Sequence, residues 1–290
     1  MALEVGVVAL SLIVATVGRE IELARLLRSL SSQAAMNFEV IIVDQNSDDC
    51  VRRMLQWQFP FPITYLQSER GASRARNLGA AKARGATLGF PDDDCWYAPG
   101  VTEHVVRLFS PLPIELLTGR IWDPEAGREV YRFPSQPFEI RLHSVPSCVS
   151  AAALFVTRSM FLSQCGFDAR LGPGAGTVWG AMEEHDLAIR CLKAGARGRY
   201  DPSLIIYHPS GAQSITPSKA RAYGGGQGFV NANYRENKPA LLWGLMRSMV
   251  GALWNCARLR PFAAAINFAA FSGRLNGYLK ARRGTLEDAQ

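Results

Sequence analysis

The stretch FPDDDCWY, residues 90–97, places Asp92, Asp93 and Asp94 directly after a short apolar run that ends at Pro91. Adjacent carboxylates repel one another unless a positive charge lies between them. A hard divalent cation such as Mg²⁺ or Mn²⁺ meets that need, because it takes oxygen ligands and bridges carboxylates to phosphates. The stretch therefore predicts a metal-binding loop at a strand end, with a solvated acidic turn as the alternative. The flanking Trp96 and Tyr97 favour the metal-binding loop.

In the part of the chain that precedes this loop, short β-branched runs alternate with helical stretches. The pattern predicts strands at 10–15, 39–43, 63–66 and 87–90, and helices at 20–33 and 72–84. This alternation is typical of strand–helix–strand crossovers and of a mostly parallel sheet. Because such sheets bind ligands at the carboxyl ends of their strands, we expect the functional residues to follow the strands.

The second half of the sequence has weaker periodicity. Residues 111–147 resemble an irregular insertion with a strand near 115–121. Further along, the pattern predicts a buried strand at 149–156, a glycine-rich loop at 166–180, a helix at 183–194 and a short strand at 204–207.

Three further clusters have residue types suited to chemistry. Asp44 ends the second strand, where a carboxylate can bind a nucleotide base or ribose; the alternative for this turn is that Ser47 or Asp48 caps the next helix. Arg70, Arg74 and Arg76 begin a helix, the arrangement that binds phosphate, with a solvated basic face as the alternative. Arg74 and Arg76 cannot both face inward on one helix.

The third cluster, EEHDL at residues 183–187, begins a helix after the glycine-rich loop. Acids at a helix start are favoured by the helix dipole, which is the simpler explanation. A glutamate presented by a mobile loop is also suited to act as a general base. His208 follows the last short strand and is a candidate metal ligand, although a lone histidine is more often structural.

Taken in this order, the clusters resemble the family 2 glycosyltransferases, which have a GT-A fold, over residues 10–210. The matching residues are Asp44 with Asn46 and Ser47, Ala75-Arg76-Asn77-Leu78-Gly79, Asp92 and Asp94, and Glu183-Glu184-His185-Asp186-Leu187. Two positions depart from the family pattern. Thr16-Val17-Gly18-Arg19 stands where members have Thr-Tyr-Asn-Arg, and Glu184 stands where aspartate is commoner.

The resemblance implies an inverting transferase that moves a sugar from a nucleotide-diphosphate sugar to an acceptor hydroxyl. Glu184 would be the catalytic base. The donor would be bound by Thr16, Asp44, Arg76, Asp92 and Asp93, and the acceptor by Glu183 and Asp186. Asp94, with Asp92 and His208, would hold Mg²⁺ or Mn²⁺.

The resemblance also implies a single α/β GT-A-like domain, with a mostly parallel central sheet flanked by helices and followed by amphipathic helices. Within it we expect a nucleotide-sugar-binding half at 1–110, an acceptor-binding half at 111–215 and a helical region at 216–290. Two other functions would suit the same fold. A sugar nucleotidyltransferase would need a glycine-rich loop after the first strand, and a silent carbohydrate-binding or scaffold protein would have lost the acids.

The net charge of +7, from 32 basic and 25 acidic residues, is concentrated near the C-terminus. Residues 219–284 contain eleven Lys or Arg and one acid, Glu236. Residues 240–258 form a helical pattern that is apolar except for one narrow polar stripe, and 262–271 are again apolar. We expect a helix pair lying in a membrane interface, with a core or dimer-packing helix or a membrane span as alternatives. Tyr223–Gly226 is expected to be a flexible linker, with a hinge or an acceptor-contact loop as the alternatives.

Six scattered cysteines and the absence of a Cys-x-x-Cys pair favour a reducing compartment. The apolar stretch 5–17 is expected to be a first strand instead of a signal peptide, because it has no basic start and carries Glu4 beside it. We therefore predict a cytoplasmic protein, peripheral on the inner face of the membrane, that acts on a glycan or lipid-linked acceptor. Basic residues interleaved with apolar helices argue against nucleic-acid binding.

Overall fold

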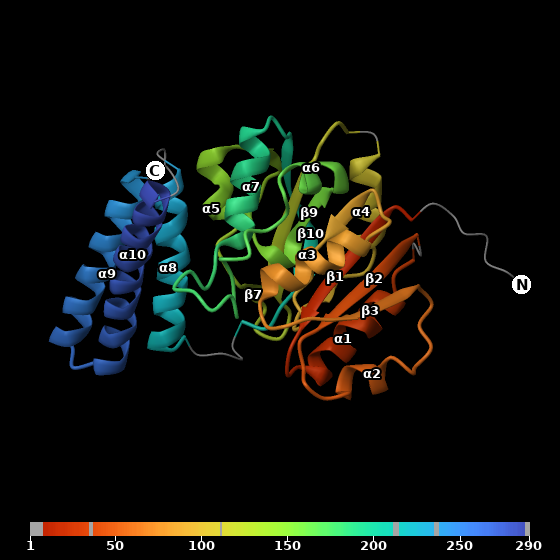
Figure 1. The fold of residues 1–290 in the computed structure, drawn as a ribbon, viewed down its shortest axis with the longest axis horizontal. Coiled ribbons are helices and arrows are strands. Elements are labelled where there is room, and N and C mark those ends of the chain that lie inside the picture. The colour runs from red at the N-terminus through yellow and green to blue at the C-terminus, as the bar shows by residue number, and fades with distance from the viewer. Residues whose placement is uncertain (1–7, 35–36, 111, 211–214, 235–237, 288–290) are drawn as a thin grey trace, which may run out of the picture. The chain divides into compact units, whose positions relative to one another are not determined.

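A computed structural model describes residues 8–34, 37–110, 112–210, 215–234 and 238–287 (Figure 1). The chain divides into two compact units. The first, here called the sheet unit, comprises Met1–Arg70, Arg74–Phe167 and Leu187–Ala212. The second, the helical unit, comprises Gly71–Ser73, Asp168–Asp186 and Gln213–Gln290. Residues 5–7 of the predicted first strand segment lie outside the described residues.

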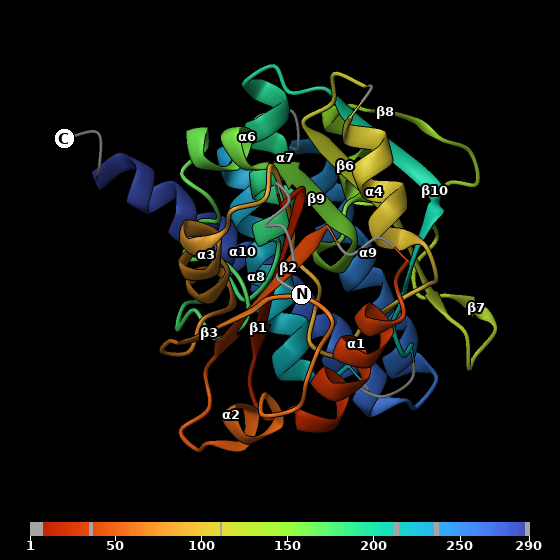
Figure 2. The same ribbon diagram turned by 90° about the vertical axis from the view of Figure 1, so that its right-hand side faces the viewer.

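The sheet unit is built on one ten-stranded sheet, counted over the residues that the structure describes (Figure 2). Its strands are β1 (Leu10–Thr16), β2 (Phe38–Asp44), β3 (Ile63–Gln67), β4 (Thr87–Gly89), β5 (Trp96–Tyr97), β6 (Leu116–Asp123), β7 (Arg128–Glu129), β8 (Phe138–Ile140), β9 (Leu154–Thr157) and β10 (Gly198–Tyr207). They are ordered β3-β2-β1-β4-β9-β6-β10-β5, with β7 beside β6 and β8 beside β10.

Strand direction decides which loops meet. The strands β3, β2, β1 and β4 are mutually parallel. Strand β9 is antiparallel to both β4 and β6, and β10 is parallel to β6. Strands β6 and β10 therefore run in the same direction as β1–β4, and the carboxyl ends of six strands lie at one edge. The predicted α/β class, with a mostly parallel sheet, is confirmed.

The helices flanking the sheet are α1 (Glu20–Ser31), α2 (Cys50–Met54), α3 (Ala72–Lys82), α4 (Val101–Phe109), α5 (Val145–Cys148), α6 (Arg158–Ser163) and α7 (Glu183–Lys193). Helix α1 buries Leu23, Leu27 and Leu30, at helical spacing, in a cluster with Leu12 and Val14 of β1. On β1 the intervening Ile13 contacts α3 at Gly79, where a Cβ atom would overlap its side chain. The alternation of strand β1 thus packs helices on both faces.

Two predicted elements differ from the observed ones, and some observed elements were not predicted. Residues 151–153 form a 3₁₀ turn before β9, because a run of alanines has little strand propensity. Strand β10 begins at Gly198, six residues earlier than expected. A register shift between Tyr200 and Ile205, around Pro202, interrupts its pattern. Helix α4 was not predicted at all, although Val101 and Val105 are buried at helical spacing.

The helical unit contains α8 (Pro217–Asn233), α9 (Lys238–Ala257) and α10 (Pro261–Glu287), which run side by side (Figure 1). The predicted linker at Tyr223–Gly226 is wrong, because these residues lie inside α8 and its three glycines are buried. A Cβ atom on Gly224 would lie 2.6 Å from the carbonyl oxygen of Ala270 in α10. The glycines therefore allow close approach of two helix backbones.

Among the residues described, no helix combines the length and apolar character required to cross a membrane.

Candidate active site

The predicted site residues of the sheet unit follow strands that end at the same edge. Thr16 and Asp44 end β1 and β2 and are paired in the sheet register. Strand β4 ends at Gly89, just before the aspartate loop, and β10 ends at Tyr207, just before His208. Because these strands share a direction, residues far apart in sequence converge there.

Asp92, Asp94 and His208 form one cluster at this edge. Each offers one ligand atom, and these three atoms lie within 4.8 Å of one another. His208 Nε2 lies 3.2 Å from Asp94 Oδ1, and its Nδ1 lies 2.9 Å from the carbonyl oxygen of Pro209. Two carboxylates and an imidazole are a donor set that suits a divalent metal ion such as Mn²⁺. The structure therefore brings together the three residues predicted to bind the metal.

Asp94 and His208 shift each other's pKa. Burial would raise the pKa of Asp94, but the hydrogen bond and charge of His208, with the charge of Arg19, lower it overall. Burial would lower the pKa of His208, but the hydrogen bond and charge of Asp94 raise it overall. The pair is thus stabilised in its charged form.

Two arginines balance the three aspartates. Arg76 is only 5% exposed, and its Nη2 lies 2.7 Å from Asp92 Oδ1. Arg19 Nη1 lies 2.7 Å from both Asp93 Oδ1 and Asp94 Oδ2. Because arginine remains charged and presents several donors, these guanidinium groups also suit an approaching diphosphate.

Asp93 differs from its two neighbours. It is 6% exposed, accepts a hydrogen bond from Arg19, and is absent from the cluster of possible metal ligands among the described residues. The backbone N–H of Val17 also donates to Asp93. Burial raises the pKa of Asp93, and the charge of Arg19 opposes this rise. Asp93 thus joins the end of β1 to the aspartate loop, and its predicted role in donor binding stays a prediction.

Two residues at the site were missed in the sequence. The sequence analysis gave Arg19 no role beyond its place in Thr16-Val17-Gly18-Arg19. In the structure it bridges two carboxylates. Arg25 on α1 donates to the carbonyl oxygen of Asp94 and lies 3.7 Å above the ring of Trp96. The helical pattern of α1, which places Arg25 away from Leu23 and Leu27, was the available signal.

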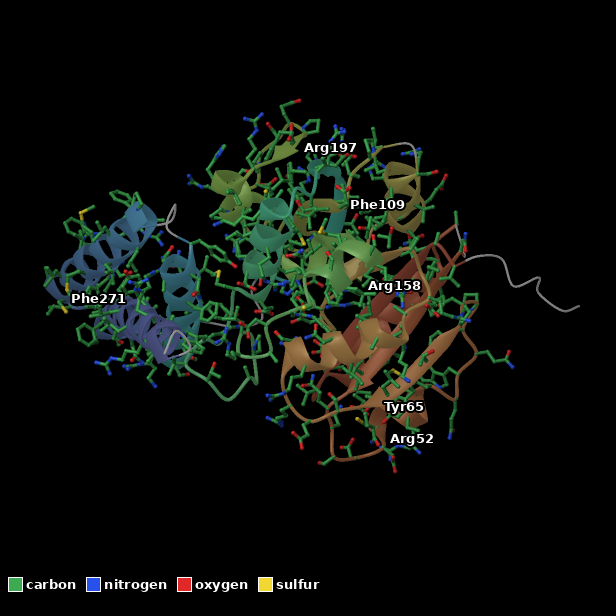
Figure 3. The ribbon with its side chains drawn as sticks, turned by 45° about the horizontal axis from the view of Figure 1, so that its top comes forward. Arg52, Tyr65, Phe109, Arg158, Arg197 and Phe271 are labelled. Carbon is green, nitrogen blue, oxygen red and sulfur yellow. The ribbon has the colours of Figure 1, made fainter. Side chains whose placement is uncertain are left out.

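Asp44 is fully buried and already accepts three hydrogen bonds. Asn46 donates from its backbone N–H and its side-chain amide, and the Tyr65 hydroxyl donates to the other carboxylate oxygen. Burial and the contact with Asp44 raise the pKa of Tyr65. Tyr65 also lies beside Arg52, whose Cζ is 5.3 Å from the ring centroid (Figure 3). Asp44 therefore holds the loop after β2 in place.

The acids at the start of α7 belong to the helical unit up to Asp186. Glu183 and Asp186 are buried, and Asp186 accepts a hydrogen bond of 2.7 Å from the hydroxyl of Tyr234. The Glu184 side chain is 16% exposed, and its Oε1 lies 3.2 Å from His185 Nδ1. Of the three acids, Glu184 is the most exposed to solvent.

The glycine-rich loop packs against these acids. Gly172 has φ of +95°, which favours glycine, and a Cβ atom there would lie 3.0 Å from Glu183 Cδ and from Ser73 Oγ. Ser73 in turn donates a hydrogen bond to the carbonyl oxygen of Leu171. The predicted loop is confirmed as irregular, and it fixes the start of α7. The roles predicted for Glu183, Glu184 and Asp186 stay predictions.

The fold is that of the GT-A class of glycosyltransferases. The model of "Glycosyl transferase family 2" matches residues 11–160, just over half of the chain, and the chain belongs to this family.

Similar proteins agree with this family. An "uncharacterized glycosyltransferase" of Haemophilus influenzae is 30% identical over 209 residues, which are 68% of this chain and 64% of that protein. A "pre-mycofactocin glycosyltransferase" of Mycobacterium tuberculosis is 27% identical over 190 residues, 62% of this chain and 39% of that protein. The chain thus matches less than two thirds of the length of either relative.

Solved structures share the fold. The crystal structure of S. aureus TarS 1–349 has a TM-score of 0.59 at 16% identity, covering 95% of this chain and 92% of that one. The mannosyltransferase PcManGT from Pyrobaculum calidifontis, in complex with GDP-Man and Mn²⁺, has a TM-score of 0.58 at 15% identity, covering 97% and 80%.

Proposed function

We propose that the chain transfers a sugar from a nucleoside-diphosphate sugar to an acceptor hydroxyl, with inversion at the anomeric carbon and with a divalent metal ion. The convergence of Asp92, Asp94 and His208 at one sheet edge, beside Arg76 and Arg19, carries the proposal. It is supported by similar folds solved with UDP-GlcNAc and with GDP-Man and Mn²⁺.

Asp92, Asp94 and His208 are the residues that would hold the metal. Their donor set fits Mn²⁺, which accepts imidazole and carboxylate ligands together, and Mg²⁺ through the carboxylates. When bound, the ion would neutralise charge on the leaving diphosphate. Arg76, held at Asp92, places a further positive charge where that diphosphate would lie.

The nucleoside would lie over the ends of β1 and β2. Thr16 and Asp44 are neighbours there, and both are buried. In this proposal, Asp44 fixes the loop through Asn46 and Tyr65, so that the base meets a preorganised surface. The ribose would lie toward Asp92, and Asp93 would keep the aspartate loop joined to β1.

Glu184 would act as the general base. It would accept the proton of the acceptor hydroxyl as that oxygen attacks the anomeric carbon, while the bond to the diphosphate breaks. Its exposure relative to Glu183 and Asp186 supports this assignment. Glu183 and Asp186 would position the acceptor by fixing the start of α7. Asp186 accepts a hydrogen bond from Tyr234, the residue that follows α8.

The acceptor would be a lipid-linked or polysaccharide precursor, and the chain would lie on the cytoplasmic face of a membrane. The exposed apolar side chains of α9 and α10, with the basic excess around them, support this part of the proposal. Such helices bind membrane interfaces through apolar area and attraction to anionic lipids.

The test is a panel of sugar nucleotides incubated with the protein and Mn²⁺, scored by release of the nucleoside diphosphate and by thermal stabilisation. We expect one donor to stabilise the protein only in the presence of the metal and to be turned over. Stabilisation by no donor, with no release from any, would contradict the proposal and favour a silent GT-A scaffold.

A further inference from the structure

Helices α9 and α10 bury mainly small and polar side chains, while many of their large apolar side chains are exposed. Their exposed large side chains include Leu242, Trp243, Met246, Val250, Leu253 and Trp254 on α9 and Phe262, Phe268, Leu275 and Leu279 on α10. In contrast, Ser248 and Arg274 are buried. This distribution is unfavourable for a helix bundle surrounded only by water, because apolar side chains are exposed while the charge of Arg274 is removed from water.

Arg274 is the residue that most needs an explanation. It is 8% exposed, and its guanidinium donates to Gln227 Oε1 at 2.7 Å and to Ser248 Oγ at 2.5 Å. These bonds use two of the five N–H donors that arginine carries. Within the described residues no carboxylate forms an ion pair with it, and burial and the charge of Arg247 lower its pKa.

The three C-terminal helices supply almost no acid to compensate this charge. Across α8, α9 and α10 the only acid is Glu287, at the last position of α10. The same helices contain eight Lys or Arg. A buried guanidinium such as that of Arg274 is stabilised when an anion lies beside it. We therefore expect an anion from outside these helices to bind near Arg274.

A pocket of about 370 Å³ opens between α9 and α10 at this point. It is lined by Arg247, Ser248 and Asn255 of α9 and by Asn267 and Arg274 of α10. The amide groups of both asparagines donate to carbonyl oxygens of their own helices, at 2.9 Å each. Each amide keeps a second N–H, and Ser248 keeps its hydroxyl proton, so the pocket offers these neutral donors beside two guanidinium groups, which are its charged donors.

The pocket borders the apolar face. At about 100° per residue, and with Arg247 set at zero, Gly251 and Ser248 point toward about 40° and 100°, into the pocket. Val250 and Trp254 fall near 300° and 340°, on the exposed face. Arg247 is itself exposed and lies between the two. An anion bound by Arg247 can therefore have an apolar chain attached that lies along α9.

We propose that the pocket between α9 and α10 binds the phosphate group of a membrane lipid, while the apolar face of α9 enters the acyl-chain boundary. Guanidinium groups bind phosphate oxygens by paired, charge-assisted hydrogen bonds. Tryptophans such as Trp243 and Trp254 are favoured at the level of lipid headgroups. The pocket supplies the donors, and the face supplies the apolar contact for the same molecule.

The proposal concerns binding and is independent of sugar transfer, so its test needs no donor or acceptor. The full chain is floated with vesicles of digalactosyldiacylglycerol, a lipid without phosphate, mixed with either phosphatidic acid or oleic acid at equal anionic charge. Tryptophan emission reports insertion. We expect binding to the phosphatidic acid vesicles to be stronger by about tenfold, as expected for a charge-assisted hydrogen bond.

Variants separate the pocket from diffuse charge. Arg247→Gln should abolish the preference for phosphatidic acid, and Arg274→Lys, which keeps the charge but loses the planar fork, should reduce it. Arg258→Gln removes the same charge beyond the end of α9, outside the pocket. It should weaken both vesicle types alike, by about fivefold, and keep the preference. Far-UV circular dichroism confirms that the helices are intact.

Three results would overturn the proposal. Equal binding of the wild type to both anionic vesicles would show that charge alone attracts the helices. An equal loss of preference in Arg247→Gln and Arg258→Gln would show that the pocket does not recognise the phosphate group. Stabilisation by millimolar inorganic phosphate that Arg247→Gln abolishes, without any vesicle binding, would assign the pocket to free phosphate instead of a lipid.

Discussion

The sheet unit and the helical unit distribute polarity in opposite ways. In the sheet unit, Leu12 and Leu27 are fully buried between β1 and α1. In the helical unit, Leu253 is 64% and Trp243 is 62% exposed, while Arg274 is buried. The sheet unit thus buries its large apolar side chains in a hydrophobic core, whereas large apolar side chains of α9 and α10 are exposed.

This difference shows that apolar composition alone does not predict a core. The contact of α8 with α10 depends on small residues, Gly224 and Gly273 among them, which leave little apolar area to bury. The large apolar side chains of α9 take no part in this contact. Because they are exposed, a partner can bind them. In the proposed function, the strand ends of the sheet unit and the start of α7 supply the chemistry, and α9 and α10 supply the attachment.

The largest expected effect concerns chemistry at the start of α7. Glu184→Gln should lower turnover by about 10²–10⁴-fold, because a general base contributes that much, while stabilisation by the donor persists. Glu103→Gln, at an exposed position of α4, is the matched control and should leave turnover unchanged. Steady-state release of the nucleoside diphosphate gives the comparison. Wild-type turnover by Glu184→Gln would remove this residue from the mechanism.

Substitution of leucine by alanine should change the free energy of unfolding more in the sheet unit than in the helical unit. Leu27→Ala in α1 should lower the free energy of unfolding by about 2–5 kcal/mol, because it leaves a cavity in a dense core. Leu253→Ala, on an exposed position of α9, should change it by less than about 0.5 kcal/mol. Urea denaturation measures both. Similar losses would mean that the face of α9 is covered in solution.

The close approach of α8 can be tested at Gly225, where a Cβ atom would overlap the carbonyl oxygen of Val178. Gly225→Ala should therefore destabilise the helical unit by about 1–3 kcal/mol, despite the higher helix propensity of alanine. At Gly244 the nearest atom is the flexible Arg274 Nε, at 3.1 Å, so Gly244→Ala should be milder. Thermal unfolding ranks the two variants, and the reverse order would refute the packing described for α8.

Glu39 provides a pH-dependent test of the sheet unit. Burial would raise its pKa, but hydrogen bonds from Arg84 and Ser11 lower it below the ordinary value of 4.5. A lowered carboxyl pKa stabilises the fold above the unfolded value, and the contribution disappears as the pH falls through the folded one. Glu39→Gln should therefore lose about 1–3 kcal/mol at pH 7. In urea titrations at a series of pH values, this deficit should shrink below about pH 4.5; a constant deficit would contradict the assignment.

The smallest expected effect concerns two exposed tryptophans. Trp254→Ser should weaken binding to anionic vesicles by about fivefold, because it removes apolar area from the face of α9. Trp57→Ser removes a tryptophan of similar exposure from the sheet unit and should have no effect. Vesicle flotation compares them. Equal losses would indicate that binding is not confined to the helices.

The sequence predicted strands β1 and β2 well, because both contain many β-branched residues and end in polar turns. The cluster of Asp92, Asp94 and His208 followed from strand ends and from the family resemblance. Arg19 was harder to foresee, because its role depends on the turn of the chain at Gly18, with φ of +66°, and not on residue type.

The helical region shows the opposite limit of sequence reasoning. Tyr223–Gly226 reads locally as a linker, since glycine disfavours an isolated helix. Its helical state depends on contact with α10, which begins almost forty residues later along the chain. The polar stripe of α9 was visible in the sequence, but not that Arg274 of α10 would lie against it.

The central claim is that carboxylates at the sheet edge perform metal-dependent chemistry. The most direct test measures Mn²⁺-dependent hydrolysis or transfer of the donor by Asp94→Asn beside Asp49→Asn, a surface carboxylate whose side chain is 66% exposed. Asp94→Asn should lose about 10³-fold in turnover, corresponding to several kcal/mol of charge stabilisation, and Asp49→Asn should match the wild type. Equal turnover in the two variants would contradict the claim.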